Sequence, residues 1–435
     1  MKLLTLLALV SIFSSNPKIE YSGRIDFSKA DAPRFSYSGV SIRACVEASL
    51  INATLNDERG ENYFAVIVDK VYTGKLKTQK GKATYQLAQF SQQGTHEIEL
   101  VKITEEMFGK TSFLGFSLND GGEIIDICNS RQHTIEFIGN SITCGYGNEG
   151  ALGQRFGAET ENHYLSYAAM TVRNFGAKPI MVCKSGIGIY RNYGGPDNGS
   201  PDCMTNFYDR TFLYDAKPKH NFEQKPDLVC INLGTNDLST QKFDSLLFIN
   251  RYLELISQVQ SHYSNTEIIC LLGPMISGKS LKAMRSYIKQ VVQKANLAEK
   301  GKVYFFEMSA QTGKYGMGTD YHPSIEQNIV NSIELTNFIS KTKGWNVIPQ
   351  IHYAKVSDNN QITLYANGNK VLFDESIINA RIFVDGTETT PTNWLINEEE
   401  HTIHIILKED ISQANKIEMV GDAAFKKIMR CKIEK

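Results

Sequence analysis

The sequence has 435 residues, of which 42% are hydrophobic and 21% charged, so it is long enough for two or three domains and has the balance of a soluble globular protein. Its formal net charge at pH 7 is −1, which leaves no electrostatic footprint for nucleic acid or for an anionic membrane. The composition therefore argues against nucleic-acid and membrane-surface partners.

Residues 1–17 have the pattern of a secretory signal peptide, because Lys2 is followed by a short apolar run and then by small residues. The run is too short to cross a bilayer, and no cysteine follows it, which argues against a lipoprotein. The pattern predicts a secreted or periplasmic protein without a membrane anchor once the leader is removed. The alternative is an N-terminal strand or helix.

Residues 18–130 carry short strand patterns and no convincing helix, which is typical of a β-sandwich. Clear strands are predicted at 63–68 and 113–118, and turns containing glycine at 80–82 and 93–95.

Residues 131–345 alternate between strand and helix patterns. Strands are predicted at 135–138, 179–182, 228–232, 268–272 and 303–306, and helices at 161–175, 242–263, 281–298 and 325–342. Because the strands are apolar along their whole length, they fit a parallel sheet that is covered by helices on both faces. We expect an α/β domain with three layers, α/β/α.

Residues 350–435 return to strand patterns after a linker at 344–349. Strands are predicted at 362–365, 371–373, 381–384, 402–407 and 416–420, with an Asn-Gly turn at 366–369. We expect a small β-sandwich. It contains no chemical motif, and packing is favoured over sugar binding as its role.

Four residues of interest, three of them polar, lie where the predicted elements of the middle domain begin or end. Ser141, Gly186 and Asn236 each lie in a polar turn directly after a predicted strand, and His322 lies just before the last helix. Since the carboxyl ends of parallel strands meet at one edge of a sheet, we expect these residues to converge there.

This order of Ser, Gly, Asn and His resembles the four blocks of the SGNH (GDSL-like) hydrolase superfamily. The segments 23–27, 32–39 and 139–147 are similar to those of carbohydrate esterase family 2. The resemblance implies a jelly-roll domain before the catalytic domain. It also implies an esterase that removes acetyl groups from the sugars of hemicellulose and needs neither a metal nor another cofactor.

An esterase of this kind needs a nucleophile, a base and donors for the oxyanion. Ser141 is the candidate nucleophile and His322 the candidate general base. The oxyanion hole would consist of the backbone N–H groups of Ser141 and Gly186 and the side-chain amide of Asn236. Asp237 is expected to support its turn rather than to react.

The acid that orients the imidazole departs from the family pattern. Many SGNH hydrolases carry Asp three residues before the His, where this chain has Thr319, and Asp320 lies only two residues before His322. Two interpretations stay open. One is a Ser141-Asp320-His322 triad, and the other is a Ser141-His322 dyad in which a backbone carbonyl holds the imidazole.

Substrate recognition is expected from the loop that follows the second block. Tyr190, Arg191 and Tyr193 are candidate substrate-binding residues, because tyrosine rings and a guanidinium suit a sugar face and its hydroxyls. The alternative is a packed pair of tyrosines that covers the sheet.

The eight cysteines include no Cys-x-x-Cys pair, so a zinc site is not expected. Cys183, Cys230 and Cys270 lie in or beside apolar runs, which predicts buried thiols. Cys144 and Cys203 both fall in active-site loops, and a disulfide between them is left open.

The residues favour a serine esterase, and the resemblance implies that its substrate is an acetylated carbohydrate, plant cell-wall polysaccharide or oligosaccharide, which it deacetylates through an acetyl-Ser141 intermediate. The alternatives are an SGNH lipase or thioesterase that acts on another acyl ester, and a carbohydrate-binding protein that has lost its activity.

Overall fold

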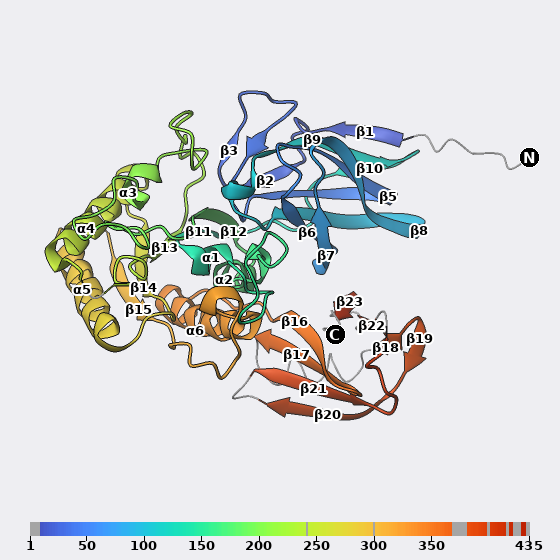
Figure 1. Ribbon diagram of the computed structural model, residues 1–435. Helices are drawn as coiled ribbons and strands as arrows, with labels where there is room; N and C mark the ends of the chain where they lie inside the picture. The colour runs from blue at the N-terminus through green and yellow to red at the C-terminus, as the bar shows by residue number, and fades with distance from the viewer. Residues whose placement is uncertain are drawn as a thin grey trace, which may run out of the picture.

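The computed structural model describes residues 9–240, 242–298, 301–367, 381–397, 401–414, 417–420 and 428–431. Along the chain, an antiparallel sheet is followed by a parallel sheet with helices and then by two further antiparallel sheets (Figure 1). The helical part lies between the two regions of antiparallel strands in the sequence, and both regions adjoin it in space.

The described N-terminal residues form one sheet of ten strands. Its strands are β1 Leu9–Phe13, β2 Glu20–Ser22, β3 Ile25–Asp26, β4 Arg34–Phe35, β5 Ser41–Asp57, β6 Tyr63–Val68, β7 Val71–Lys77, β8 Gly81–Lys102, β9 Thr111–Asn119 and β10 Glu123–Ile125, and the short helix η1 spans Glu106–Phe108. The turn predicted at 93–95 is wrong, because β8 continues through Gly94, which pairs with Ala48 beside a register shift. This glycine marks a β-bulge rather than a turn.

Strand β1 lies inside the predicted signal peptide. It pairs antiparallel with β9, from Leu9 opposite Asn119 to Phe13 opposite Gly115. Leu9 and Phe13 are 48% and 68% exposed, so the strand adds apolar surface to the sheet rather than core. The strand is the alternative that the sequence left open, and removal of a leader stays a prediction.

The central sheet has five parallel strands in the order β12-β11-β13-β14-β15. These are β11 Thr134–Gly139, β12 Lys178–Cys183, β13 Leu228–Asn232, β14 Glu267–Leu272 and β15 Val303–Glu307. All five predicted strands are present, within one residue at each end. The helices are α1 Ser141–Cys144, η2 His163–Leu165, α2 Tyr167–Asn174, α3 Met204–Phe207, α4 Ser245–His262, α5 Gly278–Leu297, η3 Thr319–Tyr321 and α6 Ile325–Lys343.

Apolar residues of the parallel strands face both sides of the sheet. Phe137 of β11 packs with residues of α2 and α6, whereas its neighbour Ile138 packs in the cluster that contains α4 and α5. This is why the strand sequences are apolar throughout rather than alternating. Helix α2 begins later than predicted, because Ser166 caps it by accepting a hydrogen bond from the Ala169 N–H at 3.3 Å.

The described C-terminal residues form two antiparallel sheets of four strands each. One consists of β16 Gln350–Asp358, β17 Gln361–Asn367, β21 Thr402–Leu407 and β20 Pro391–Asn397, and the other of β19 Thr387–Thr389, β18 Arg381–Val384, β22 Ile417–Val420 and β23 Ile428–Cys431. Ile362, Ile403, Ile382 and Ile417 from the two sheets share one apolar core. The predicted strand 371–373 and the end of the Asn-Gly turn lie outside the described residues.

A disulfide joins Cys45 on β5 to Cys128, with the two Cα atoms 6.0 Å apart. The pairing of Cys144 with Cys203 that the sequence left open is wrong, because both are free thiols. Among the cysteines whose side chains the structure describes, the free ones are buried, namely Cys144, Cys183, Cys203, Cys230 and Cys270. The prediction of buried thiols at Cys183, Cys230 and Cys270 is confirmed.

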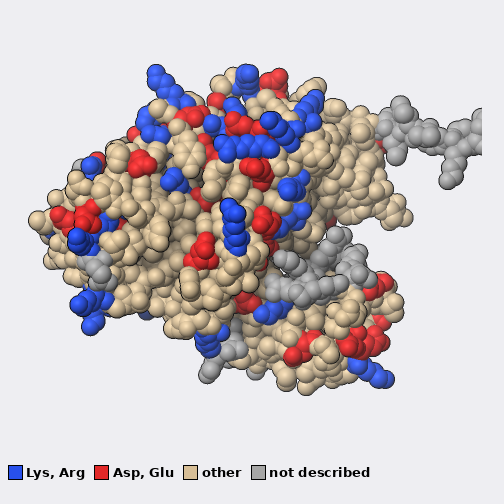
Figure 2. Space-filling model, viewed as in Figure 1, with Lys and Arg blue, Asp and Glu red and all other residues tan. Residues whose placement is uncertain are grey.

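Acidic and basic side chains are interspersed over the face of the molecule seen in Figure 2, as the net charge of −1 implies. None of the helices in the described part of the chain is both long and apolar enough to cross a membrane.

Candidate active site

The nucleophile candidate stands at the carboxyl edge of the central sheet. Ser141 is the first residue of α1 and follows β11 directly, and Asn140 caps the helix by accepting a hydrogen bond from the Ile142 N–H at 3.1 Å. A Cβ on Gly139 would lie 2.0 Å from Thr143 Oγ1, so this sharp turn requires glycine. Because the first N–H groups of a helix have no partner further back, the N–H of Ser141 is left for another acceptor.

His322 approaches this serine as expected, with its Nε2 2.8 Å from Ser141 Oγ. Its Nδ1 lies 3.2 Å from the backbone carbonyl oxygens of both Thr319 and Asp320. A carbonyl can only accept, so Nδ1 carries the proton and Nε2 is the free acceptor. The tautomer is therefore the one that can take a proton from the serine hydroxyl.

Burial lowers the pKa of His322, and the two backbone carbonyls and the charge of Asp320 oppose this shift in part. The imidazole is therefore neutral at pH 7, which is the form that a general base requires. The two residues before it, Asp320 and Tyr321, have φ values of 51° and 61°. Non-glycine residues seldom adopt this left-handed conformation, and it is often found at functional sites.

The carboxylate of Asp320 does not take the position of a triad acid. It accepts a hydrogen bond from the Tyr146 hydroxyl at 2.8 Å, whereas the hydrogen-bond acceptors at Nδ1 of His322 among the described residues are the two carbonyls. Of the two arrangements that the sequence left open, this geometry corresponds to the Ser141-His322 dyad, and the role of Asp320 stays a prediction. The physical reason for this geometry is the offset of two residues, which turns the Asp320 side chain toward Tyr146.

The second and third turns begin beside the first. Gly139 at the end of β11 lies opposite Cys183 of β12 and Asn232 of β13, so all three polar turns leave the same edge. Gly186 has a φ of +77°, which favours glycine. Asn236 donates from Nδ2 to the Ile187 carbonyl at 2.7 Å; only the NH2 can donate, so this bond fixes the orientation of the amide and leaves its second N–H for a ligand.

Asp237 is fully buried and binds the loop that follows Gly186. Its carboxylate accepts from the backbone N–H groups of Ile189, Tyr190 and Arg191 at 2.8 to 3.0 Å. Burial raises the pKa of Asp237 to about 6, and these three N–H groups oppose the increase. The expected supporting role is what this geometry shows, because the residue ties the third turn to the second.

Two of the three expected substrate-binding residues are buried. Tyr190 and Arg191 are only 2% and 1% exposed. The Arg191 guanidinium donates to the Asp237 carbonyl, and the Tyr190 hydroxyl accepts from the Asp244 N–H at 3.1 Å. Because these groups are used within the loop, the substrate-binding interpretation is wrong for both. Tyr193 is 73% exposed and stays a candidate.

Glu105, which precedes η1 in the N-terminal region, was not predicted as a site residue. Its carboxylate accepts hydrogen bonds from the Ser185 N–H at 2.6 Å and from the Ser185 hydroxyl. An acidic residue before a short helix carries no motif. The N-terminal region therefore helps to build the site in a way that only the structure shows.

Aromatic rings line the side of the base. The ring of Tyr146 lies 4.3 Å from that of His322, centroid to centroid, and stacks on Phe156 at 3.6 Å. Tyr146 lies in the first block, 139–147, and this position beside the candidate nucleophile is the sequence feature that could have marked it as a site residue. A wall of this kind suits the flat face of a sugar ring.

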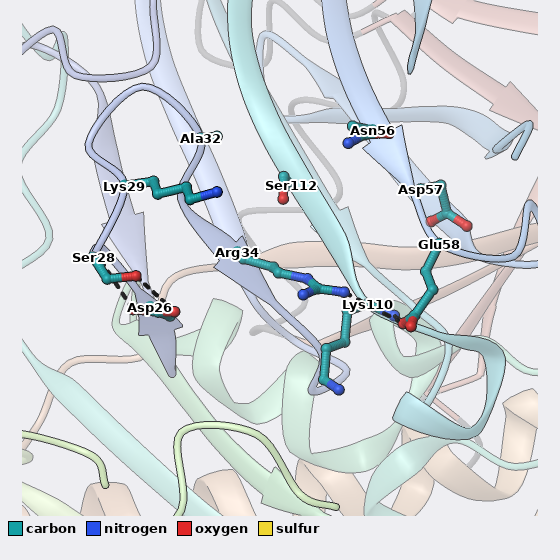
Figure 3. Close-up of a pocket in the computed structure, with 10 residues that line it drawn as sticks. All are labelled: Asp26, Ser28, Lys29, Ala32, Arg34, Asn56, Asp57, Glu58, Lys110 and Ser112. Carbon is teal, nitrogen blue, oxygen red and sulfur yellow. Dashed lines mark hydrogen bonds and ion pairs between the residues drawn. The ribbon is translucent and has the colours of Figure 1, made fainter. Parts of the chain in front are cut away.

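A separate pocket of about 380 Å³ lies in the N-terminal region (Figure 3). Its charged residues are Asp26, Asp57, Glu58, Lys29, Arg34 and Lys110. Arg34 pairs with Glu58 at 3.6 Å, and Lys110 pairs with Asp215 at 3.0 Å. With these charges balanced and none of the four blocks in its lining, we assign this pocket no part in the chemistry.

Comparisons with known proteins agree with this geometry. Residues 21–127 match the family model "Carbohydrate esterase 2 N-terminal", and residues 137–327 match "GDSL-like Lipase/Acylhydrolase family". A solved family two carbohydrate esterase from Clostridium thermocellum, in complex with cellohexaose, is 37% identical over 75% of this chain and 99% of that chain, with a TM-score of 0.71. The chain belongs to carbohydrate esterase family 2.

Curated relatives of this family 2 chain include Cellulase/esterase CelE of Acetivibrio thermocellus, which is 38% identical over 76% of this chain. The chain spans only 40% of that relative's length. An acetylxylan esterase / glucomannan deacetylase of Cellvibrio japonicus is 25% identical over 77% of this chain and 92% of its own length. As a member of carbohydrate esterase family 2, the chain is a carboxylic ester hydrolase. Both family models end before β16, so the C-terminal strands lie outside them.

Proposed function

We propose that this protein is a serine esterase that removes O-acetyl groups from plant cell-wall polysaccharide or its oligosaccharides, as acetylxylan esterases do. The observation that carries the proposal is the 2.8 Å contact between Ser141 Oγ and His322 Nε2, made by an imidazole whose proton is held on Nδ1. The names of the relatives, a cellulase/esterase and an acetylxylan esterase / glucomannan deacetylase, support the choice of an acetylated carbohydrate.

In the first half of the reaction, His322 Nε2 takes the hydroxyl proton while Ser141 Oγ attacks the acetyl carbonyl. The oxyanion of the tetrahedral intermediate accepts from the N–H groups of Ser141 and Gly186 and from Asn236 Nδ2. The intermediate collapses, the sugar oxygen leaves with the proton from His322, and an acetyl group remains on Ser141.

In the second half, water attacks the acetyl group and gives its proton to His322 Nε2. Acetate leaves, and the proton returns to Ser141 Oγ. The imidazolium that forms twice in this cycle has no carboxylate on Nδ1. The carbonyl oxygens of Thr319 and Asp320 and the nearby charge of Asp320 stabilise it instead.

We further propose that residues 1–17 are a signal peptide, and that the mature protein works outside the cell or in the periplasm, where such polysaccharides are met. It would consist of an N-terminal jelly-roll domain at 18–130, a three-layer SGNH domain at 131–345 and a C-terminal β-sandwich at 350–435. N-terminal sequencing of protein recovered from the culture medium or periplasm tests the leader, since an intact Met1 there would contradict it.

The test of the activity is acetate release from acetylated xylo-oligosaccharides by the wild type and by Ser141→Ala. We expect a loss of about 10⁴-fold. Ser261→Ala is the matched control, because Ser261 lies on the exposed part of α4 and bonds only its own helix. Equal rates for wild type and Ser141→Ala would remove the serine mechanism. Faster cleavage of octanoyl than of acetyl esters would favour a lipase.

A further inference from the structure

A second pocket of about 850 Å³ lies between the active-site loops and the C-terminal strands. Its walls are the loop 148–154, the loop 314–317, the first turns of α6, and one face of β16, β17 and β21. We call it the interdomain pocket. Its volume is in the range of sites that hold small ligands, which are often found between domains.

The strand face in this pocket is polar and hydrogen-bonded into a network. Thr363 lies opposite His404 in the β17–β21 register, and its hydroxyl is 3.0 Å from His404 Nδ1. Gln361 Nε2 is 3.1 Å from the same nitrogen, and Ser357 Oγ is 2.7 Å from Thr363 Oγ1. Side chains alternate along a strand, so Ile362 points away into the apolar core. Thr363 is buried beneath this network. The face thus presents the exposed hydroxyl of Ser357 and the half-buried amide of Gln361 and imidazole of His404.

The charged residues of the pocket are largely compensated. Lys355 pairs with Glu326 of α6 at 2.5 Å, and Glu149 pairs with Lys75 of β7. Such a surface has no net attraction for an anion or a cation. Tyr315 adds a ring to the same lining. Neutral hydrogen-bonding groups beside a tyrosine ring suit a neutral ligand with many hydroxyls.

The pocket shares its two loops with the catalytic centre. The loop 148–154 begins two residues after Tyr146, whose ring contacts His322, and the loop 314–317 ends five residues before His322. The loops are bonded to each other where the Thr319 N–H donates to the Gly147 carbonyl at 2.9 Å. The two loops that line the pocket are therefore continuous in sequence with the segments that carry Tyr146 and His322.

We propose that the interdomain pocket is a carbohydrate-binding subsite that holds neutral sugar units of the same polysaccharide, at a distance from the acetylated unit. The inference rests on the proposed function for its link to catalysis. The loops and the start of α6 that line the pocket lie inside the matched hydrolase model, whereas its wall of C-terminal strands lies outside both models. The subsite gives the C-terminal region a role in choosing long over short substrates.

The test compares a long and a short substrate in one double variant, Gln361→Ala with His404→Ala. We expect the ratio of kcat/KM for acetylated xylohexaose to kcat/KM for p-nitrophenyl acetate to fall about tenfold, because hydrogen bonds to distal sugar units are lost. Asn393→Ala is the matched control, since Asn393 is exposed on β20 of the same sheet and outside the pocket lining. The control should keep the ratio of the wild type.

A second variant, Ala151→Trp, fills the pocket from the loop side and leaves the sheet untouched, so the proposal does not depend on the folding of the double variant. Calorimetric titration of unacetylated xylohexaose into Ser141→Ala protein, with and without the pocket substitutions, measures binding directly. Unchanged ratios together with unchanged affinity would overturn the subsite. A wild type that cleaves neither ester would overturn the proposed function instead, while binding that depends on Gln361 and His404 would still support the subsite.

Discussion

Glu105, a residue of the N-terminal region, holds Ser185 of the catalytic domain through two hydrogen bonds to one carboxylate. Ser185 precedes Gly186, whose N–H is a proposed oxyanion donor. The position of that donor therefore depends on a side chain 80 residues earlier in the chain. The two regions form one functional unit at this contact.

Glu105→Gln should lower kcat about 10- to 100-fold with a smaller change in KM, because an amide cannot accept both Ser185 bonds and the Gly186 N–H loses its support. Steady-state kinetics with p-nitrophenyl acetate measure this. Glu97→Gln is the matched control, because Glu97 is a buried carboxylate on β8 of the same N-terminal region and pairs with Arg43. It should lower stability without this loss of kcat. A wild-type kcat for Glu105→Gln would contradict the anchoring role.

Asp320→Asn should lower kcat less than tenfold, whereas loss of a true triad carboxylate costs about 10⁴-fold. The base acts when neutral, so activity is lost as the pH falls through the His322 pKa. Burial lowers that pKa and the Asp320 charge opposes the shift, so removing the charge should move the acid limb of the kcat/KM profile to lower pH. Tyr146→Phe, which keeps the carboxylate, is the control. A shift to higher pH would contradict this assignment.

Substitutions of Arg191 and Tyr193 should have different effects, the first on the stability of the fold and the second on substrate binding. Arg191→Ala leaves the buried Asp237 carbonyl without its donor, so we expect the free energy of unfolding to fall by about 3 kcal/mol. Tyr193→Ala should raise KM for acetylated oligosaccharide and leave stability unchanged, because the ring is exposed. Urea unfolding and steady-state kinetics on both variants check the pair. A raised KM with unchanged stability for Arg191→Ala would instead support a role of Arg191 in substrate binding.

Gly318→Ala should slow catalysis although its backbone φ of −79° suits alanine. The added Cβ would lie 2.3 Å from the Gly147 carbonyl oxygen, so the loop that carries His322 must move away from the first block. We expect kcat to fall at least tenfold, since small misplacements of catalytic groups are costly. Gly94→Ala, which meets only the end of a flexible His96 side chain, should keep wild-type kcat.

The parallel sheet and the three polar turns at its carboxyl edge were predictable, because each depends on a short stretch of sequence. An apolar run marks a buried strand, and Ser141, Gly186 and Asn236 follow such runs directly. The Ser141–His322 approach also followed, since both residues lie at the edge where the strands end. The distance of 2.8 Å between Ser141 Oγ and His322 Nε2 could be obtained only from the structure.

Features that depend on distant partners were not predictable. The stretch containing Tyr190 and Arg191 has the polar and aromatic composition of a surface loop, and its burial follows from Asp237, which supplies acceptors for its N–H groups. The segment around Gly94 was predicted to be a turn because glycine is common both in turns and in β-bulges. The partner of Cys45 could not be selected from sequence, because spacing alone does not determine connectivity.

The Cys45–Cys128 bridge spans 83 residues, and Glu105 lies within the segment that it closes. By the chain-entropy argument, such a closure removes about 4–5 kcal/mol of disorder from the unfolded state. Once a thiol reagent reduces the disulfide, the segment between the two cysteines is held only by non-covalent contacts, and its unfolded state gains conformational entropy. We then expect the half-life of the enzyme at elevated temperature to shorten well before its initial rate declines.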